Sequence, residues 1–209
     1  MRVPTRLVLV RHGQTDWNAG QRIQGHTDIP LNALGRWQAT QLALALAEED
    51  FDAVYASDLA RASETATPFA AGRLQLEPGL RERHFGAFEG LSFAQIEQRW
   101  PAQARLWRLR DPAFGPPGGE MLADFSARCV AVVDRLARRH AGGSIALVAH
   151  GGVLDSLYRA ATSVPLAAPR SWEIGNATIN RLLHTDGGFT LVGWNDDGHL
   201  TRTPNLTLG

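Results

Sequence analysis

Two short aliphatic runs, far apart in the chain, each end in the dipeptide His-Gly. Residues 7–10 are followed by Arg11-His12-Gly13, and residues 144–149 are followed by His150-Gly151. Runs of this length and composition are typical of strands buried on both faces of a parallel sheet. Ligands of open α/β sheets bind just beyond the carboxyl ends of such strands. We therefore expect the two histidines to meet at one edge of a sheet.

The residues at the first strand end suit phosphate chemistry. An arginine presents a planar fork of donors that matches phosphate oxygens, and a neutral imidazole can attack phosphorus. Gly13 permits a tight exit from the strand, in which backbone N–H groups can approach a ligand closely. Arg11 and His12 could instead do no more than end a strand, but the second His-Gly junction favours the ligand-binding alternative.

Arg61 is a further candidate for anion binding. It follows a strand predicted over residues 51–57 and lies early in a helix whose N-cap is expected to be Ser57 or Asp58. A positive charge is unfavourable in the first turn of a helix, because the helix dipole is positive there. An arginine at this position therefore indicates a bound anion.

Strands and helices alternate along the chain. Besides the strands above, residues 74–76 form a short predicted strand, and residues 178–183 and 189–194 predict a hairpin. Helical patterns are found after Pro30, over residues 92–100, over 122–136 and over 153–161. This order predicts an α/β fold, a three-layer α/β/α sandwich with a mostly parallel central sheet and an antiparallel edge.

The chain contains no linker or internal repeat that would divide it, so residues 1–209 are expected to form a single domain. Residues 91–119 are expected to form a small helical lid inserted in that domain. Its helix begins with a capping box at Ser92 and is expected to end at Trp100, before Pro101. Trp100 and Trp107 are expected to anchor the packing of the lid.

The charge balance and the cysteine content bear on the class of function. The chain has 21 Lys+Arg and 21 Asp+Glu residues, so no net charge draws it to nucleic acid or to a membrane surface. The single cysteine, Cys129, cannot form an internal disulfide and is expected to be a small buried hydrophobe. No long apolar run stands near the N-terminus, so we expect no signal peptide or membrane span and predict a cytoplasmic protein.

Four blocks of the sequence, taken in order, resemble the histidine phosphatase superfamily, which has the phosphoglycerate-mutase-like fold. They are Arg11-His12-Gly13, residues 57–66 around Arg61, residues 80–90 around Glu82, and His150-Gly151. The resemblance runs from about Arg6 to at least Asn180. It implies a metal-independent phosphomonoesterase that hydrolyses small phosphorylated metabolites through a phosphohistidine intermediate.

The resemblance also implies a role for each candidate residue. His12 is expected to be the nucleophile, and Glu82 the acid that protonates the leaving oxygen. Arg11, Arg61 and His150 are expected to hold the phosphate oxygens. His12 has to be neutral for its attack, whereas His150, next to the phosphate charge, is expected to tend toward protonation.

The loop over residues 19–28 is expected to fold over the active site. Further substrate contacts are expected from Asn18, Gln24, Gly25 and Gly151. Asn18 and Gln24 could instead satisfy only loop backbone groups, Glu82 could be only an exposed ion pair, and Glu89 is its rival as the acid. No Cys, His and Asp cluster has metal-site spacing, so neither a metal nor a cofactor is expected.

Two other functions stay open on the sequence alone. A phosphoglycerate mutase must keep its phosphohistidine from water with extra closing segments, but this chain is short between Gly90 and Gly119. It also carries Phe85 where mutases usually carry tyrosine, and both departures favour a phosphatase. An inactive phospho-ligand or partner-binding module would usually lack the nucleophile or the acid. The physiological substrate and the oligomeric state stay open, a homodimer being one alternative.

Overall fold

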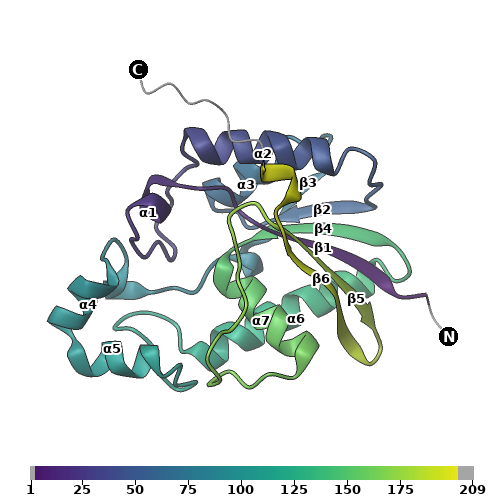
Figure 1. The fold of residues 1–209 in the computed structure, drawn as a ribbon. Coiled ribbons are helices and arrows are strands. Elements are labelled where there is room, and N and C mark those ends of the chain that lie inside the picture. The colour runs from purple at the N-terminus through teal and green to yellow at the C-terminus, as the bar shows by residue number, and fades with distance from the viewer. Residues whose placement is uncertain (1–2, 202–209) are drawn as a thin grey trace.

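The computed structural model describes residues 3–201, which fold around a single six-stranded sheet (Figure 1). The strands are β1 (Thr5–Arg11), β2 (Ala53–Ala56), β3 (Leu74–Leu76), β4 (Ser144–Ala149), β5 (Ile179–Thr185) and β6 (Gly188–Asp196). Their order in the sheet is β3-β2-β4-β1-β5-β6; β3, β2, β4 and β1 run parallel, and β5 and β6 are antiparallel. The predicted α/β class is thus confirmed, although both ends of the predicted domain, residues 1–2 and 202–209, lie outside the described residues.

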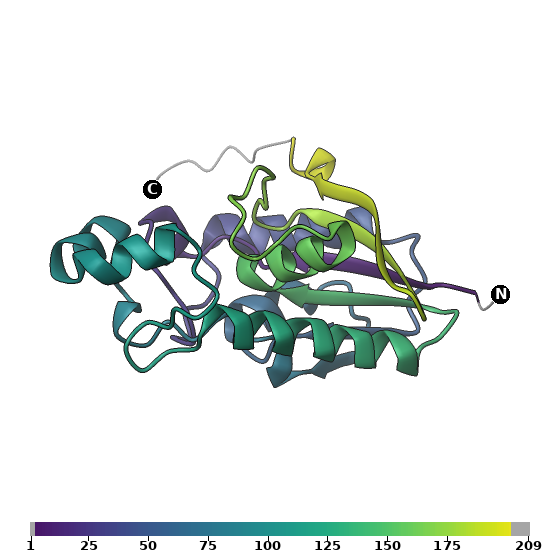
Figure 2. The same ribbon diagram turned by 90° about the horizontal axis from the view of Figure 1, so that it is seen from below.

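Helices cover both faces of the sheet (Figures 1 and 2). The helices of these outer layers are α2 (Ala33–Ala45), α3 (Ala60–Ala66), α6 (Leu122–Arg139) and α7 (Gly151–Thr162). The four aliphatic residues of β1 serve both layers, since Val8 and Val10 belong to the core with Leu42 of α2, whereas Leu7 and Leu9 belong to the core under α6 and α7. This division explains why the strand is apolar at every position.

The lid is a separate helical unit beyond the end of the sheet (Figure 2). It holds α4 (Phe93–Arg99) and α5 (Pro101–Arg108) around its own buried cluster, in which Trp100 and Trp107 pack as predicted. The expected helix does end before Pro101, but α5 was not predicted. Proline suits the first position of a helix, because its missing N–H would have no partner there, so Pro101 begins a new helix.

The predicted N-cap of α3 is wrong. The capping position is Leu59, whose side chain makes no capping bond, and neither Ser57 nor Asp58 occupies it. Instead, Asp28 reaches across from the loop and accepts a 2.7 Å bond from the backbone N–H of Ala60. The carboxylate that complements the helix dipole therefore comes from a residue 32 positions away along the chain.

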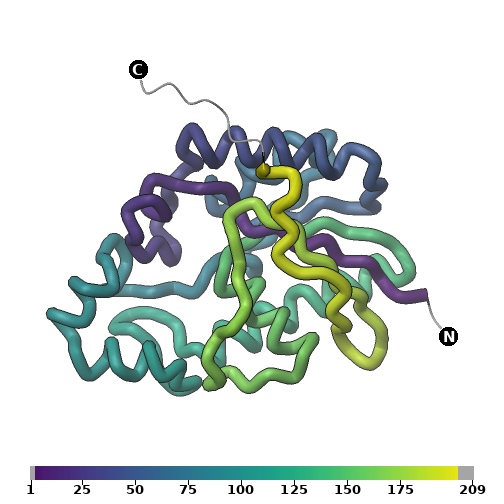
Figure 3. The backbone as a smooth tube through the Cα atoms, in the orientation of Figure 1, coloured from purple at the N-terminus to yellow at the C-terminus, as the bar shows by residue number. Residues whose placement is uncertain are grey.

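Several short elements complete the fold. They are α1 (Asp16–Ala19) and the 3-10 helices η1 (Pro78–Leu80), η2 (Gly86–Phe88) and η3 (Gly198–Leu200). After α7, residues 163–178 form a strap that runs along the carboxyl edge of the sheet before β5 begins (Figure 3). The strap is tied to β1 by the backbone bond from Ala177 N to Arg11 O. In residues 3–201 we find no helix both long and apolar enough to cross a membrane.

Candidate active site

The two His-Gly junctions meet at one sheet edge, as expected from the sequence. Arg11 at the end of β1 pairs with Ala149 at the end of β4, and the N–H of His12 donates to the Ala149 carbonyl at 2.9 Å. The next residues, His12 and His150, therefore leave neighbouring parallel strands side by side. Their ring centroids are 5.1 Å apart, and both side chains are buried.

The imidazole of His12 is held in one tautomer. Its Nδ1 lies 2.7 Å from the carbonyl oxygen of Gly13, and a carbonyl can only accept, so Nδ1 carries the proton. The lone pair is then on Nε2. Burial, followed by the charges of Arg61 and Arg11, lowers the pKa of His12 well below its ordinary value. His12 is therefore neutral and nucleophilic at Nε2.

His150 differs from His12 in its hydrogen bonding. Neither ring nitrogen finds a hydrogen-bond partner among the described residues, although the ring is fully buried. Burial and the nearby Arg61, His12 and Arg11 lower its pKa well below the ordinary value. The protein's own groups thus favour neutral His150, and the expected protonated form depends on the negative charge that a substrate brings.

Two arginines converge on the histidines. Arg11 donates through Nη1 to the carbonyl of Ile174 at 2.6 Å, and Arg61 donates to the carbonyls of Gly25 and Thr27 at 2.8 and 3.0 Å. The Nε groups of both arginines are buried without an acceptor in residues 3–201. Burial lowers the pKa of Arg61 to about 10, so it remains a cation at neutral pH.

The loop before α2 contributes amides to the same place. Asn18 is the third residue of α1, and its Oδ1 accepts bonds from the N–H and hydroxyl of Thr15. Gln24 similarly uses its Oε1 to accept from the Thr15 hydroxyl at 3.0 Å. Their oxygens satisfy the loop, as the alternative interpretation held, while both side chains still line the pocket and their amide nitrogens remain available as donors.

Glu82 lines the same pocket as Arg11 and His12. Its Oε1 accepts the N–H of Arg83 at 2.8 Å, and its Oε2 accepts the N–H of Gly152 at 3.0 Å. A Cβ on residue 152 would collide with Oε1, so glycine is required for this close approach. Arg81 pairs instead with Asp58 at 2.5 Å, so the alternative that Glu82 is an ion pair with its neighbours does not fit.

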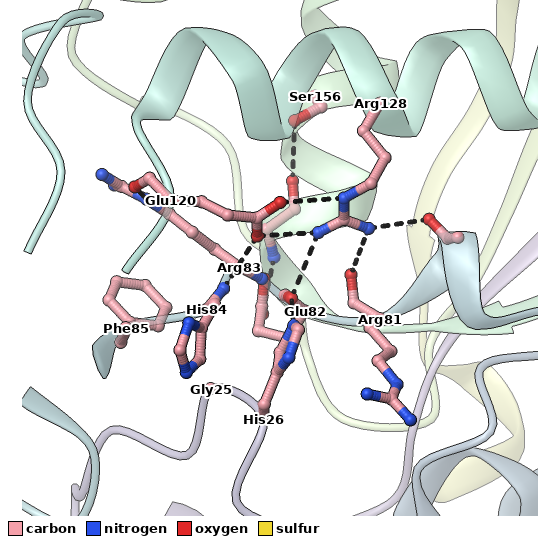
Figure 4. A network of polar contacts seen from close by, with 12 residues as sticks. Gly25, His26, Arg81, Glu82, Arg83, His84, Phe85, Glu120, Arg128 and Ser156 are labelled. Atoms are coloured by element: carbon pink, nitrogen blue, oxygen red, sulfur yellow. Dashed lines mark hydrogen bonds and ion pairs between the residues drawn. The ribbon is translucent and has the colours of Figure 1, made fainter. Parts of the chain in front are cut away.

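A half-buried polar network fixes the backbone of the segment that carries Glu82 (Figure 4). Arg128 of α6 donates to the carbonyls of Gly79, Arg81 and Glu82 and pairs with Glu120 at 2.8 Å. His26 caps the other side, with its Nε2 2.8 Å from the Glu82 carbonyl. Contacts from both sides therefore hold the segment that carries Glu82.

The rival acid, Glu89, is occupied by the loop. Its carboxylate accepts bonds from the N–H groups of His26, Thr27 and Phe85 and from the Thr27 hydroxyl, at 2.6 to 3.0 Å. Burial would raise the pKa of Glu89, but these bonds outweigh it and lower the pKa below its usual value. Gly25 passes so close to Glu89, at φ +54°, that a side chain there would collide with the carboxylate. Glu89 is thus a structural acceptor.

These groups surround a pocket of about 250 Å³. Of the predicted residues, it is lined by Arg11, His12, Asn18, Gln24, Gly25, Arg61, Glu82 and Gly151. His150 lies beneath it, in contact with His12. Sequence reasoning missed Arg22, Ile23, Gly152, Arg170 and Ile174 as lining residues. Gly152 was detectable as the residue after His150-Gly151, but Arg170 carries no local signal, since it lies in the strap outside any helix or strand.

Comparison with known proteins agrees with this geometry. Residues 7–197 match the model of the histidine phosphatase superfamily, branch 1. Phosphoglycerate mutase-like protein 4 of Arabidopsis thaliana is 39% identical over 97% of this chain and 90% of its own. The metal-independent phosphoserine phosphatase of the same plant is 34% identical over 98% of this chain and 87% of its own.

A solved structure shows the same fold. The phosphoserine phosphatase of Entamoeba histolytica, in complex with 3-phosphoglyceric acid, superposes with a TM-score of 0.85. It is 28% identical in sequence, and the match covers 94% of this chain and 99% of that one. With the family predicted from four sequence blocks thereby confirmed, this chain belongs to the histidine phosphatase superfamily, branch 1.

Proposed function

We propose that this chain is a metal-independent phosphomonoesterase that hydrolyses small phosphorylated metabolites through a phosphohistidine at His12. The phosphatases among its relatives confirm the enzyme class predicted from the sequence, that of a phosphoric monoester hydrolase. The observation that carries the proposal is the contact of His12 with His150 between two arginines, with Nδ1 of His12 tied to the Gly13 carbonyl. This arrangement aims a neutral lone pair at an anion site.

In the first half-reaction, Nε2 of His12 attacks phosphorus in line with the leaving oxygen. The P–N bond forms while the P–O bond to the alcohol breaks, and Glu82 gives its proton to the departing oxygen. Arg11 and Arg61 hold the equatorial oxygens, on which charge accumulates in the transition state. The N–H groups at the start of α7, at Gly151, add neutral donors.

In the second half-reaction, water attacks the phosphorus of the phosphohistidine. Glu82 now accepts a proton from that water, the P–N bond breaks, and its electron pair returns to Nε2 of His12. His150 takes up a proton when the phosphate dianion is bound, because the anion offsets the burial and the arginines that keep its ring neutral. Arginines, with no help from a divalent ion, supply the positive charge in this scheme.

The proposal is tested by following released phosphate and the covalent intermediate together. Wild-type protein mixed with a labelled monoester and quenched in alkali should carry an acid-labile, alkali-stable label at His12. A mutase would instead transfer the label between glycerate phosphates with little release, and an inactive binding module would carry no label. Label on any residue other than His12 would contradict the proposed mechanism.

Two properties predicted from the sequence remain proposals. We place the protein in the cytoplasm, without nucleic acid or a membrane as a partner, and take a homodimer as one alternative for its oligomeric state. Cell fractionation and light scattering would test the two statements separately.

A further inference from the structure

A chain of two hydrogen bonds connects the proposed nucleophile with helix α2. Gln38 of α2 accepts the N–H of Gln14 through its Oε1 at 2.8 Å. That N–H belongs to the peptide group between Gly13 and Gln14, and the carbonyl of the same peptide group accepts the Nδ1 proton of His12 at 2.7 Å. Gln38 is not among the residues that line the catalytic pocket. It is nevertheless joined to the imidazole of His12 by a single peptide group.

The start of α2 holds this peptide group closely. A Cβ on Gly13 would lie 2.6 Å from the carbonyl oxygen of Gly35, so the two backbones are in direct contact. Asn32, the N-cap of α2, donates its backbone N–H to the Gln14 carbonyl and its side-chain amide to the Gln14 side chain, both at 3.0 Å. The residues on either side of the peptide group are therefore fixed against the helix that carries Gln38.

Thr65 of α3 holds the other peptide group of Gly13. Its buried hydroxyl accepts the N–H of Gly13 at 2.9 Å and donates to the Arg61 carbonyl at 2.6 Å. Glycine has a wide choice of backbone conformations, so this bond alone does not set the direction of the Gly13 carbonyl. In a planar trans peptide group the N–H and the carbonyl point in opposite directions. The bond from the Gln14 N–H to Gln38 therefore aims the carbonyl at His12.

The chain also affects the strength of the acceptor at His12. Hydrogen bonds in a chain polarise one another, so an acceptor on the N–H of a peptide group makes its carbonyl a stronger acceptor. A stronger acceptor at one ring nitrogen of a histidine raises the basicity of the other, as the histidine ligands of metals show. Gln38 and the peptide group are both neutral, so they have this effect without adding a negative charge beside the anion site.

We propose that Gln38 is a positioning residue for the nucleophile, which it holds in the tautomer with the lone pair on Nε2. The inference rests on the proposed function, in which Nε2 of His12 attacks phosphorus. Without Gln38, the Gln14 N–H loses its acceptor, and the peptide group is free to turn toward another one. The Gly13 carbonyl then leaves Nδ1, and a proton on Nε2 blocks the attack.

The test removes the acceptor and then restores it. Gln38→Met keeps the length of the side chain but cannot accept a strong hydrogen bond. It should lower kcat for p-nitrophenyl phosphate by about 10- to 100-fold, the typical cost of losing the group that orients a histidine. KM should stay within about threefold, because the substrate contacts remain. Gln38→Glu keeps an oxygen acceptor and should bring kcat back to within about threefold of the wild type.

The control is Gln41→Met, the same substitution three residues further along α2. Gln41 has no hydrogen bond to the active-site loop in residues 3–201, so kcat should stay within about twofold. Circular dichroism should show that all three variants are folded.

The tautomer of His12 gives a readout that a loss of stability alone would not change. The ¹⁵N NMR shifts of an imidazole distinguish a protonated from an unprotonated nitrogen, and the spectrum of His12→Asn identifies the signals of His12. At neutral pH the wild type, Gln38→Glu and Gln41→Met should carry the proton on Nδ1. Gln38→Met should show a mixture of the two tautomers.

The outcomes separate this role from the proposed function. If Gln38→Met keeps the wild-type kcat, or if Gln38→Glu is no faster than Gln38→Met, Gln38 is not a positioning residue and the phosphatase stands. A loss of kcat in Gln38→Met with the tautomer unchanged, or an equal loss in Gln41→Met, would reduce the role to the stability of α2 and would overturn the inference. If the wild type releases no phosphate from any monoester, the proposed function itself fails.

Discussion

The two sides of the pocket hold their cations differently. On the phosphate side, Arg61 donates to the carbonyls of Gly25 and Thr27, and His12 is fixed by the carbonyl of Gly13. On the other side of Glu82, Arg83 and Arg110 also donate to acceptors of the protein, but the guanidinium of Arg170 has no acceptor within residues 3–201. The phosphate side is therefore preorganised for one charge distribution, whereas the other side can be matched to different alcohols.

The comparison indicates where substitutions should matter. Preorganised donors act on charge that develops in the transition state, so their loss reduces kcat. A group that contacts an unreacting part of the substrate changes KM and substrate preference. The predictions below test this division, beginning with the largest expected effect.

Replacing the nucleophile should have the largest effect. His12→Ala should reduce kcat for phosphate release by about 10⁴-fold or more, because both half-reactions need Nε2. Far-UV circular dichroism should remain that of the wild type. If activity survives this substitution, the nucleophile is another residue or a water molecule. The division between groups that set kcat and groups that set KM would then not hold.

Replacing the acid should affect substrates unequally. Glu82→Gln should slow alkyl phosphates by about 10²- to 10⁴-fold and p-nitrophenyl phosphate far less, since a nitrophenolate leaves without a proton. Glu89→Gln is the matched control and should lower stability rather than separate the two substrate types, because Glu89 holds the loop. Equal losses on both substrates in Glu82→Gln would assign Glu82 a structural role.

The buried histidines should make the phosphate side sensitive to acid. The pKa values of His12 and His150 lie well below about 6.5, the ordinary value that they regain on unfolding. Their contribution to stability is therefore present above pH 6.5 and lost as the pH falls below it, by up to about 1.4 kcal/mol per pH unit for each. Urea unfolding of the double variant His12→Asn/His150→Asn should therefore give a free energy of unfolding that falls less steeply between pH 7.5 and 5.5 than that of the wild type. An equally steep fall in the variant would contradict this.

The smallest expected effect is that of a chelator. Dialysis against EDTA should leave kcat unchanged, whereas vanadate, which mimics five-coordinate phosphorus, should inhibit in competition with substrate. The reason is that Arg11 and Arg61 supply the positive charge on the phosphate side. Loss of activity on dialysis, restored by a divalent ion, would show that the arginines do not suffice.

The phosphate side was also the side that the sequence predicted best. His12 and His150 follow strands whose apolar runs are plain, and parallel neighbours must end at one sheet edge. Short-range signals of this kind located Arg11, Arg61 and the Gly13 exit as well. Glu82 was predicted from its resemblance to a family motif. Its contact with the N–H of Gly152 was not predicted, because it depends on α7 beginning beside Glu82.

The other side of Glu82 could not be predicted in the same way. Arg170 lies in a strap without helix or strand, and its place depends on Trp172, which stacks on α7, and on a bond from the lid. The N-cap of α3 failed for a related reason, since Asp28 competes with the local candidates from a distant loop. In both cases the deciding contact joins segments whose separation along the chain leaves no periodic signal.

The loop that carries Asp28 has a consequence for the binding of phosphate. It caps α3 through Ala60 and supplies both carbonyl acceptors of Arg61, so it cannot lift without loosening the cation that we propose holds the phosphate. Coupling of this kind is reciprocal, so a bound phosphate that orders Arg61 also holds the loop closed. A substitution that frees the loop should therefore weaken the binding of inorganic phosphate, and bound phosphate should disfavour the open loop by the same factor.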